Sequence, residues 1–347
     1  MTILFNRIRA WRNLFKLGPY GKFARTWGVY FRNLVVLGLK DNVLNFLKQP
    51  RTFLEIKREF NVIDDKFLSL LLDTLLSDNT IEKTSKGFLL NKNLEVEVIP
   101  PKAFAKSLIQ FAENMANSVF DRLSNKFLDV SSGSNLFILD DALSQKAYET
   151  ARRAAISFVP NSIKSPGKLL DLGCGSGIST ADFWTQTMKK HNFNPKNNFK
   201  LIGVDINEDF MNIANHEFYY SVKKYLELTK EEYSDLKPYH PEFKVGTTTQ
   251  IPYPNNYFDY IYTSQVLHWT DLKSSLDEIY RCLKTEGVYF GTQMLFPHAN
   301  SYLNIMVNTI KGVGGLFTKE EFITAAEQAG FSKLKFCTPL TIFKLRK

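Results

Sequence analysis

The chain has 347 residues, of which 44% are hydrophobic and 23% charged, a balance typical of a globular protein with room for two domains. Its three cysteines, at 174, 282 and 337, form no CxxC pair, so neither a disulfide framework nor a zinc site is indicated, and a cytoplasmic location is expected. No apolar run is long enough to cross a membrane, since even Val29–Leu39 contains Arg32.

The net charge of +9 belongs to one end of the chain. Residues 1–60 hold twelve basic and three acidic side chains, so the remainder is neutral overall. Residues 1–40 begin with a predicted basic amphipathic helix whose apolar face holds Leu4, Ile8, Trp11 and Phe15. Three interpretations are open: a helix packed on its own fold or on a second subunit, a helix on an anionic membrane surface, or an organelle transit peptide.

Residues 41–99 are expected to form a small helical domain. Helical stretches at 41–49, 51–60 and 64–79 precede two short strands within 80–91. This is the order of a winged-helix domain, which on its own would indicate DNA binding. The third helix, however, is apolar on most faces and carries aspartates, whereas a recognition helix reads bases with Arg, Lys, Asn or Gln. We therefore predict a packing and dimerisation domain, hence a homodimer, with nucleic acid not expected as a partner.

Residues 100–165 are predicted to be a helical linker. Its helices are expected at Lys102–Asn125 and Asp140–Phe158, with a loop at Ser131–Asn135 between them. Prolines at 100, 101, 160 and 166 mark the two boundaries.

Residues 166–347 alternate between strand and helix patterns. Strands are expected at 168–171, 200–204, 257–264, 288–293 and 340–345, with helices at 180–190, from about 208, at 274–284 and at 319–329. Such alternation predicts a mostly parallel sheet covered on both faces, an α/β fold of the Rossmann-like class. The polar stretch at 219–243 is interpreted as a surface insertion.

The first of these strands runs into a glycine-rich turn, DLGCGSG, at 171–177. The spacing is neither the GxGxxG of dinucleotide-binding proteins nor the GK[ST] of phosphate loops. The pattern D-x-G-x-G-x-G after a strand resembles motif I of the class I S-adenosylmethionine (SAM)-dependent methyltransferases. That resemblance implies SAM as the cofactor, a seven-stranded sheet, and a linker that covers the active-site mouth.

Ligands of parallel sheets bind at the carboxyl ends of the strands. The residues expected to contact SAM lie at or just beyond such ends: Asp171, Gly173, Cys174, Gly175, Gly177, Asp205, Ile206, Thr247, Thr248 and Gln265. Asp205 closes the strand LIGVD and is placed to accept hydrogen bonds from the ribose hydroxyls, with Ile206 as an apolar wall for adenine. The resembling family has an aspartate for the adenine amino group where this chain has Thr247, so a hydroxyl or the backbone must replace it.

His268 is the candidate catalytic residue. The order His-Trp-Thr-Asp from 268 resembles the His-Asp-Trp-Ser-Asp of plant O-methyltransferases, whose histidine is the general base. A histidine suits that role because its usual pKa lies near neutral pH. The alternative is a packed or helix-capping histidine. Nothing in the sequence requires a metal.

The resemblance extends over most of the chain, because the front domain resembles the winged-helix domain of small-molecule O-methyltransferases. It implies methylation, of oxygen first, on a small and apolar acceptor. A lipid-borne acceptor would suit the basic N-terminal segment and a site peripheral to a membrane. The competing hypothesis is a non-catalytic interaction or DNA-binding regulatory protein that keeps the SAM fold. The intact glycine turn and Asp205 favour the enzyme.

Overall fold

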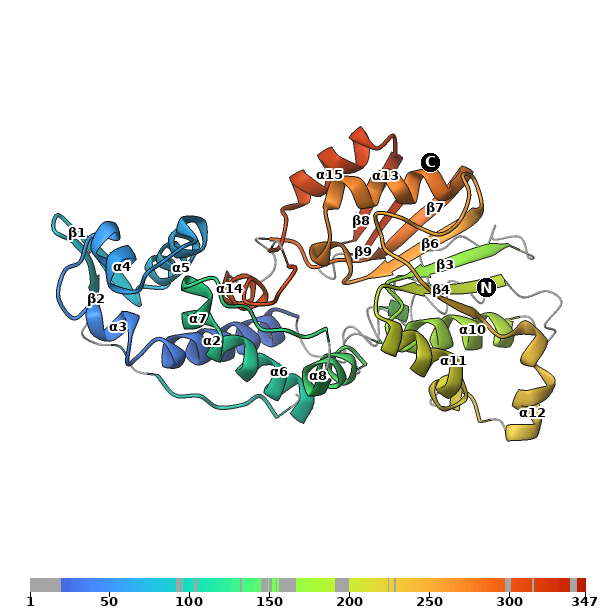
Figure 1. Ribbon diagram of the computed structural model, residues 1–347, viewed down its shortest axis with the longest axis horizontal. Helices are drawn as coiled ribbons and strands as arrows, with labels where there is room; N and C mark the ends of the chain where they lie inside the picture. Colours follow the sequence, from blue (N-terminus) through green and yellow to red (C-terminus); the bar gives the residue numbers. More distant parts are fainter. Residues whose placement is uncertain are drawn as a thin grey trace. The chain divides into compact units, whose positions relative to one another are not determined.

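Two compact units make up the chain (Figure 1). The computed structural model describes residues 20–91, 94, 96–102, 105–131, 133–144, 149, 152, 153, 155, 167–190, 200–223, 225–227, 229–296, 301–313, 315–337 and 342–347. The helical unit holds the described residues of 20–143 and 296–316, and the sheet unit holds those of 144–295 and 317–347. The amphipathic helix expected within 1–19, and most of the helix expected at Asp140–Phe158, fall outside the described residues.

The helical unit contains the elements predicted for residues 41–91. Its helices are α2 (Tyr20–Gly38), α3 (Val43–Phe46), α4 (Phe53–Glu59), α5 (Asp65–Ser77), α6 (Lys106–Asn117), α7 (Val119–Leu123), α8 (Gly133–Leu143) and α14 (Ser301–Val307). The strands β1 (Ile81–Thr84) and β2 (Gly87–Leu90) pair as an antiparallel hairpin. Thr52 and Asp64 cap α4 and α5 with their side chains, which explains where these helices begin. A winged-helix dimerisation role for this domain stays a prediction.

One difference from the sequence concerns α14, which was expected within a continuous domain at 166–347. Ile305 and Met306 are fully buried, and the Tyr302 hydroxyl donates to Asp78 Oδ2 at 2.6 Å, an oxygen that also pairs with Arg32. The Leu128 backbone N–H donates to the Thr309 carbonyl at 2.8 Å. Residues 296–316 therefore belong to the helical unit, because their apolar side chains find their partners there.

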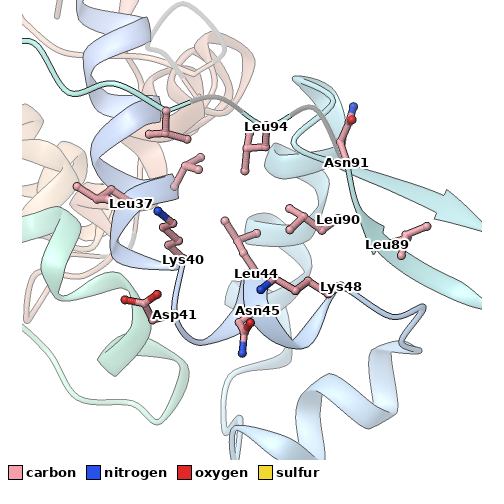
Figure 2. A pocket seen from close by; sticks show the side chains of 12 residues that line it. Leu37, Lys40, Asp41, Leu44, Asn45, Lys48, Leu89, Leu90, Asn91 and Leu94 are labelled. Carbon is pink, nitrogen blue, oxygen red and sulfur yellow. The ribbon is translucent and has the colours of Figure 1, made fainter.

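A pocket of about 390 Å³ opens beside α2, α3 and β2 (Figure 2). Seven of its twelve lining residues are apolar, among them Val36, Leu44 and Leu90, and the polar ones include the exposed Lys40 and Lys48. The pocket belongs to the helical unit, whereas the glycine turn belongs to the sheet unit.

The sheet unit is built on seven strands in the order β5-β4-β3-β6-β7-β9-β8. They are β3 (Lys168–Leu172), β4 (Lys200–Asp205), β5 (Glu242–Val245), β6 (Phe258–Ser264), β7 (Leu283–Thr292), β8 (Ser332–Cys337) and β9 (Ile342–Arg346). All pairs from β5 to β7 are parallel, whereas β9 runs antiparallel to both β7 and β8. The predicted Rossmann-like, mostly parallel fold is confirmed, and the strand order reverses between β3 and β6.

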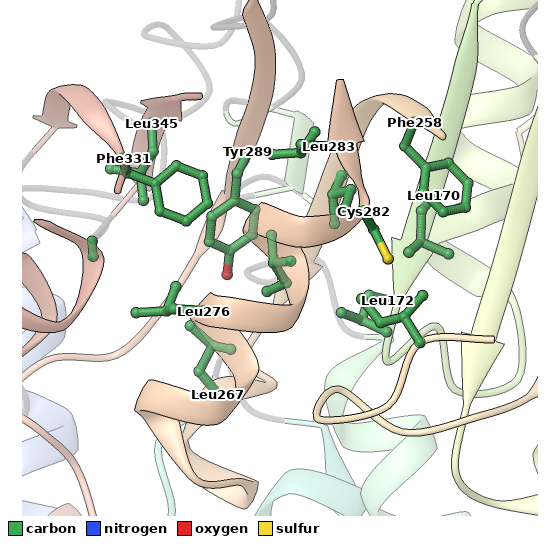
Figure 3. Close-up of a cluster of buried hydrophobic side chains, with 14 of the residues drawn as sticks. Leu170, Leu172, Phe258, Leu267, Leu276, Cys282, Leu283, Tyr289, Phe331 and Leu345 are labelled. Atoms are coloured by element: carbon green, nitrogen blue, oxygen red, sulfur yellow. The ribbon is translucent and has the colours of Figure 1, made fainter. Parts of the chain in front are cut away.

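Two apolar layers hold helices on the faces of this sheet. On one face, α13 (Leu272–Cys282) and α15 (Lys319–Gln328) pack through a cluster that includes Leu172, Phe258 and Tyr289 (Figure 3). On the other, α10 (Ile178–Lys190) and α11 (Glu208–Lys223) pack through a cluster that includes Trp184 and Phe218. No helix among the described residues is both long and apolar enough to cross a membrane.

The expected helix at 274–284 and strand at 288–293 have different bounds in the structure. The helix α13 stops at Cys282, and β7 follows at once because Leu283 pairs with Phe258 across a bulge. Gly287 therefore lies inside β7, where a Cβ would come within 2.7 Å of the Lys284 carbonyl oxygen. The insertion at 219–243 also contains a short helix, α12 (Lys230–Asp235).

Candidate functional site

The glycine turn after β3 requires three glycines for its backbone conformation. Gly173, Gly175 and Gly177 have φ of 73°, 55° and 85°, the left-handed region that other residues avoid. At Gly173, a Cβ would lie 2.4 Å from Cγ2 of Val266, which follows β6. The turn is thus packed against the end of the neighbouring strand, at the point where the strand order reverses.

Asp171, in β3, is 1% exposed, and only one of its two carboxylate oxygens accepts hydrogen bonds from the described residues. Its Oδ2 accepts hydrogen bonds from Ser179 Oγ at 2.7 Å and Thr180 Oγ1 at 2.6 Å, both on α10. Its Oδ1 is buried and has no hydrogen-bond partner among the described residues. Burial raises the pKa of Asp171 to about 6, against the lowering effect of the two hydroxyls. A buried carboxylate oxygen without a donor is an acceptor left for a ligand.

Asp205, at the end of β4, ties the second strand end to the glycine turn. Its Oδ2 accepts from the Gly175 N–H at 2.9 Å and its Oδ1 from the Asn207 N–H at 3.0 Å. Each carboxylate oxygen keeps a further lone pair, so ribose hydroxyls can still bind. Burial raises the pKa of Asp205, and the backbone hydrogen bonds oppose that shift. Beside it, Ile206 is 70% exposed, so a ligand can reach this apolar side chain, and its role as a wall for adenine stays a prediction.

The ring of Phe243, in β5, packs against the glycine turn and β4, and Phe243 was not among the site residues predicted from the sequence. A Cβ on Gly203 would lie 2.5 Å from Phe243 Cδ1, and one on Gly177 would lie 3.1 Å from Phe243 Cζ. Cys174 is buried, and its thiol donates to the Gly175 carbonyl at 3.6 Å. Burial raises the pKa of this thiol well above its usual range, so Cys174 packs as a neutral side chain.

The two threonines differ in orientation. Thr248 is buried, and its hydroxyl lies 2.8 Å from Ser275 Oγ on α13. The half-buried Thr247 has its hydroxyl 3.3 Å from that of Thr249, and it remains the threonine that a ligand could reach. The adenine contact of the two residues stays a prediction, and Thr247 is the better placed.

Gln265 follows β6 with φ of 58°, an uncommon conformation for this residue type. Its backbone N–H donates to the Thr292 carbonyl at 2.8 Å, and its Oε1 accepts from the Met294 N–H at 2.9 Å. The residue therefore bridges the carboxyl ends of β6 and β7. Its side chain joins the two strand ends at the edge of the sheet where the sequence predicts contacts with SAM.

His268 lies in the 3₁₀ helix η3 (Leu267–Trp269) and is 5% exposed. Its Nδ1 is 3.0 Å from Nε2 of Gln293, which directly follows β7. Burial lowers the pKa of His268 to about 4. Gln293 was not predicted as a site residue, since a single glutamine after a strand carries no sequence signal of such a contact.

The fit of SAM can be judged from these residues. The glycine turn leaves room for backbone contact, Asp171 offers an unpaired acceptor, and Asp205 with Ile206 combines a carboxylate with an apolar surface. SAM carries an amino group, ribose hydroxyls and adenine that match these features in kind. In the described part of the chain, no three His, Cys, Asp or Glu side chains lie close enough together to hold a metal ion.

Comparisons with known proteins identify the type of domain that carries these residues. Residues 170–291 match the family described as "Methyltransferase domain". The ubiquinone/menaquinone biosynthesis C-methyltransferase UbiE of Rickettsia akari is 28% identical over 179 residues, which is 51% of this chain and 59% of that protein. The chain spans about 39 to 63% of the length of the curated relatives it matches.

Solved structures with this fold include enzymes of two kinds. The CurJ carbon methyltransferase superposes with a TM-score of 0.66 at 13% identity, covering 94% of this chain and 92% of that one. An O-methyltransferase family 2 protein from Planctomyces limnophilus superposes with a TM-score of 0.56 at 17% identity, covering 93% and 96%. These likenesses show the fold, and the methyltransferase domain implies SAM as methyl donor.

Proposed function

Residues 170–291 form a class I methyltransferase domain, and on this premise we propose that the protein transfers a methyl group from SAM to a small-molecule acceptor. The observation that carries the proposal is the hydrogen bond from the Gly175 N–H to Asp205 Oδ2, at 2.9 Å. It joins the glycine turn after β3 to the carboxylate at the end of β4. A small polar ligand at this edge of the sheet would meet both.

The acceptor is proposed to be a small, apolar metabolite. Oxygen is the acceptor atom favoured by the resemblance of the front domain to small-molecule O-methyltransferases. Carbon is the alternative, supported by the relative UbiE, a C-methyltransferase, and by the structural neighbour CurJ, a carbon methyltransferase. SAM, when bound, supplies an electrophilic methyl group on a sulfonium, so the protein's own task is to align the acceptor with it.

Two partners beyond the acceptor are proposed from the sequence. A homodimer would form through the helical front domain, and residues 1–40 would contact an anionic membrane. Twelve basic residues against three acids in residues 1–60 support the second proposal. Removing residues 1–18 should weaken binding to anionic vesicles, and unchanged binding would refute the proposed membrane contact.

Methyl transfer is tested by incubating the full chain with methyl-labelled SAM and an extract of the source cells. We expect label in a low-mass product, whose identification gives the acceptor. The Gly175→Val variant should transfer none, because its side chain would occupy the ligand's space and strain a backbone at φ 55°. Gly133→Val, at φ 65° in open space, is the matched control for strain alone. Absence of labelled product from every extract fraction would count against the enzyme.

The competing hypothesis is a non-catalytic interaction or DNA-binding regulatory protein on the same fold. Such a protein has no need of three left-handed glycines, one of which donates to a carboxylate, yet Gly173, Gly175 and Gly177 have this conformation and the Gly175 N–H donates to Asp205. This retention supports the enzyme.

A further inference from the structure

The side chain of Gln293 is held in one orientation by the backbone around it. It is 1% exposed. Its Oε1 accepts from the Leu267 N–H at 3.2 Å, and its Nε2 donates to the Met294 carbonyl at 3.3 Å. If the amide were rotated by 180°, its NH₂ group would face the Leu267 N–H, another donor, and its oxygen would face the Met294 carbonyl, another acceptor. The positions of its oxygen and nitrogen are therefore fixed by groups that cannot change their roles.

This orientation decides which nitrogen of His268 carries the proton. Gln293 Nε2 lies 3.0 Å from His268 Nδ1, and an amide nitrogen can only donate. Nδ1 must then accept, so the neutral ring has its proton on Nε2. Burial keeps the ring neutral at pH 7 by lowering its pKa to about 4. Nε2 has no hydrogen-bond partner among the described residues.

The imidazole is carried by a segment that borders the glycine turn. Val266, which precedes η3, packs closely against Gly173: a Cβ added to Gly173 would lie 2.4 Å from Val266 Cγ2. Gln265 bonds to Thr292 and Met294 on either side of Gln293. The carboxyl ends of β3, β6 and β7 thus hold the glycine turn and His268 in one rigid arrangement.

A general base needs a free nitrogen lone pair that can take a proton from the acceptor. In this tautomer the Nδ1 lone pair accepts from Gln293, and Nε2 carries a proton instead of a lone pair. We propose that His268 is a hydrogen-bond donor to the acceptor through Nε2–H, and that Gln293 is the positioning residue that fixes this tautomer. The inference rests on the proposed methyl transfer and narrows its acceptor class. The acceptor must carry an oxygen that takes this hydrogen bond, and it must lose its proton to water. The bond from sulfur to methyl then breaks as the acceptor's electron pair forms the new one, with charge on the held oxygen stabilised by Nε2–H.

The tautomer is measured directly on the full chain without any ligand. In histidine labelled with ¹⁵N, long-range proton–nitrogen correlations at pH 7 should show the proton of His268 on Nε2, with the signal assigned by its loss in His268→Gln. Gln293→Glu should move the proton to Nδ1 and raise the pKa of the ring by at least about one unit, since a carboxylate only accepts. A proton on Nδ1 in the wild type would overturn the inference.

The role in turnover is separated from that of a base by two substitutions. Glutamine places a donor N–H near the position of Nε2 but cannot take a proton, whereas leucine offers neither. With methyl-labelled SAM and the acceptor-bearing extract, His268→Gln should retain the rate within about tenfold, and His268→Leu should lose about 10²-fold or more. Equal losses in both variants would rule out the donor role.

Calorimetric titration of SAM into each variant distinguishes this inference from the proposed function. Unchanged SAM affinity in His268→Gln and His268→Leu shows that both fold, so a difference in rate reports on the acceptor. If the wild type transfers no methyl group to any extract, the proposed function fails, whereas the proton position on His268 is still decided by resonance.

Discussion

The two carboxylate oxygens of Asp171 have different surroundings. One oxygen accepts from Ser179 and Thr180 at the start of α10, and the other is buried without a donor in the part of the chain that the structure describes. An unpaired buried acceptor costs about 1 to 3 kcal/mol, which the amino group of a bound ligand would relieve. The residue is therefore part of the support of the turn as well as a candidate contact.

The raised pKa of Asp171 predicts a pH dependence of SAM binding. Above about pH 6 the carboxylate is ionised and attracts a cationic amino group, and below it the protonated group loses that attraction. The dissociation constant measured by calorimetry should thus rise as pH falls from 7 to 5, by up to about tenfold per unit. Asp171→Asn should bind more weakly at pH 7 and show a flatter profile. A wild-type constant that does not change over this range would contradict the assignment.

At the scale of elements, the edge strand β5 packs against the glycine turn through Phe243. The Phe243 ring lies against both Gly177 and Gly203, so the turn and β4 depend on one aromatic side chain. Neither glycine can gain a side chain without moving this ring.

Gly203→Ala should therefore destabilise the protein and weaken SAM binding together. The new Cβ would stand 2.5 Å from Phe243 Cδ1 and 2.9 Å from Cys174 Sγ, an overpacking that typically costs about 1 to 3 kcal/mol. Urea unfolding and SAM titration measure the two effects. Adding Phe243→Leu in the same chain should recover part of both losses, and a double variant with purely additive losses would show that the ring is not the cause.

The elements that the sequence predicted best are those with a strong burial pattern. β3, β4 and β6 are central strands with apolar runs, so their bounds agree closely with the expected ones. β5 and β8 were not predicted because edge strands expose most side chains, as Lys333 and Lys335 do in β8. The start of β7 was also hidden, because only pairing with Phe258 makes Leu283 a strand residue.

In the candidate site, too, residues within a local sequence pattern could be predicted, whereas contacts between distant parts of the sequence could not. The glycine turn and Asp205 could be predicted because their spacing in sequence is itself the signal. The contacts of Gln293 and Phe243 could not, because they join strands that are distant in sequence and neighbouring only in the sheet. His268 was identified as a residue of interest, but its proton position depends on that unseen glutamine.

At the scale of the whole molecule, the chain leaves the sheet unit after β7, contributes α14 to the helical unit, and returns before α15. Tyr302 secures α14 by donating to Asp78, which also pairs with Arg32. Two distant parts of the sequence thus complete one helical core.

Tyr302→Phe tests this attachment. It removes a 2.6 Å hydrogen bond to a carboxylate while keeping the buried ring, so the free energy of unfolding should fall by about 2 kcal/mol. Urea unfolding gives the change, with Tyr220→Phe, at a residue that is 57% exposed, as the control. Equal stability of the two variants would mean that α14 is held by its apolar contacts alone.

The most direct test of the central claim is calorimetric titration of SAM into the full chain and into Asp205→Ala. The wild type should bind in the micromolar range with one site per chain, because the glycine turn and Asp205 present a formed edge for the ligand. Asp205→Ala should bind at least about tenfold more weakly, since a carboxylate that accepts charge-assisted or hydroxyl hydrogen bonds is lost. No heat of binding at SAM concentrations well above the micromolar range would contradict the assignment of this protein as a SAM-dependent methyltransferase.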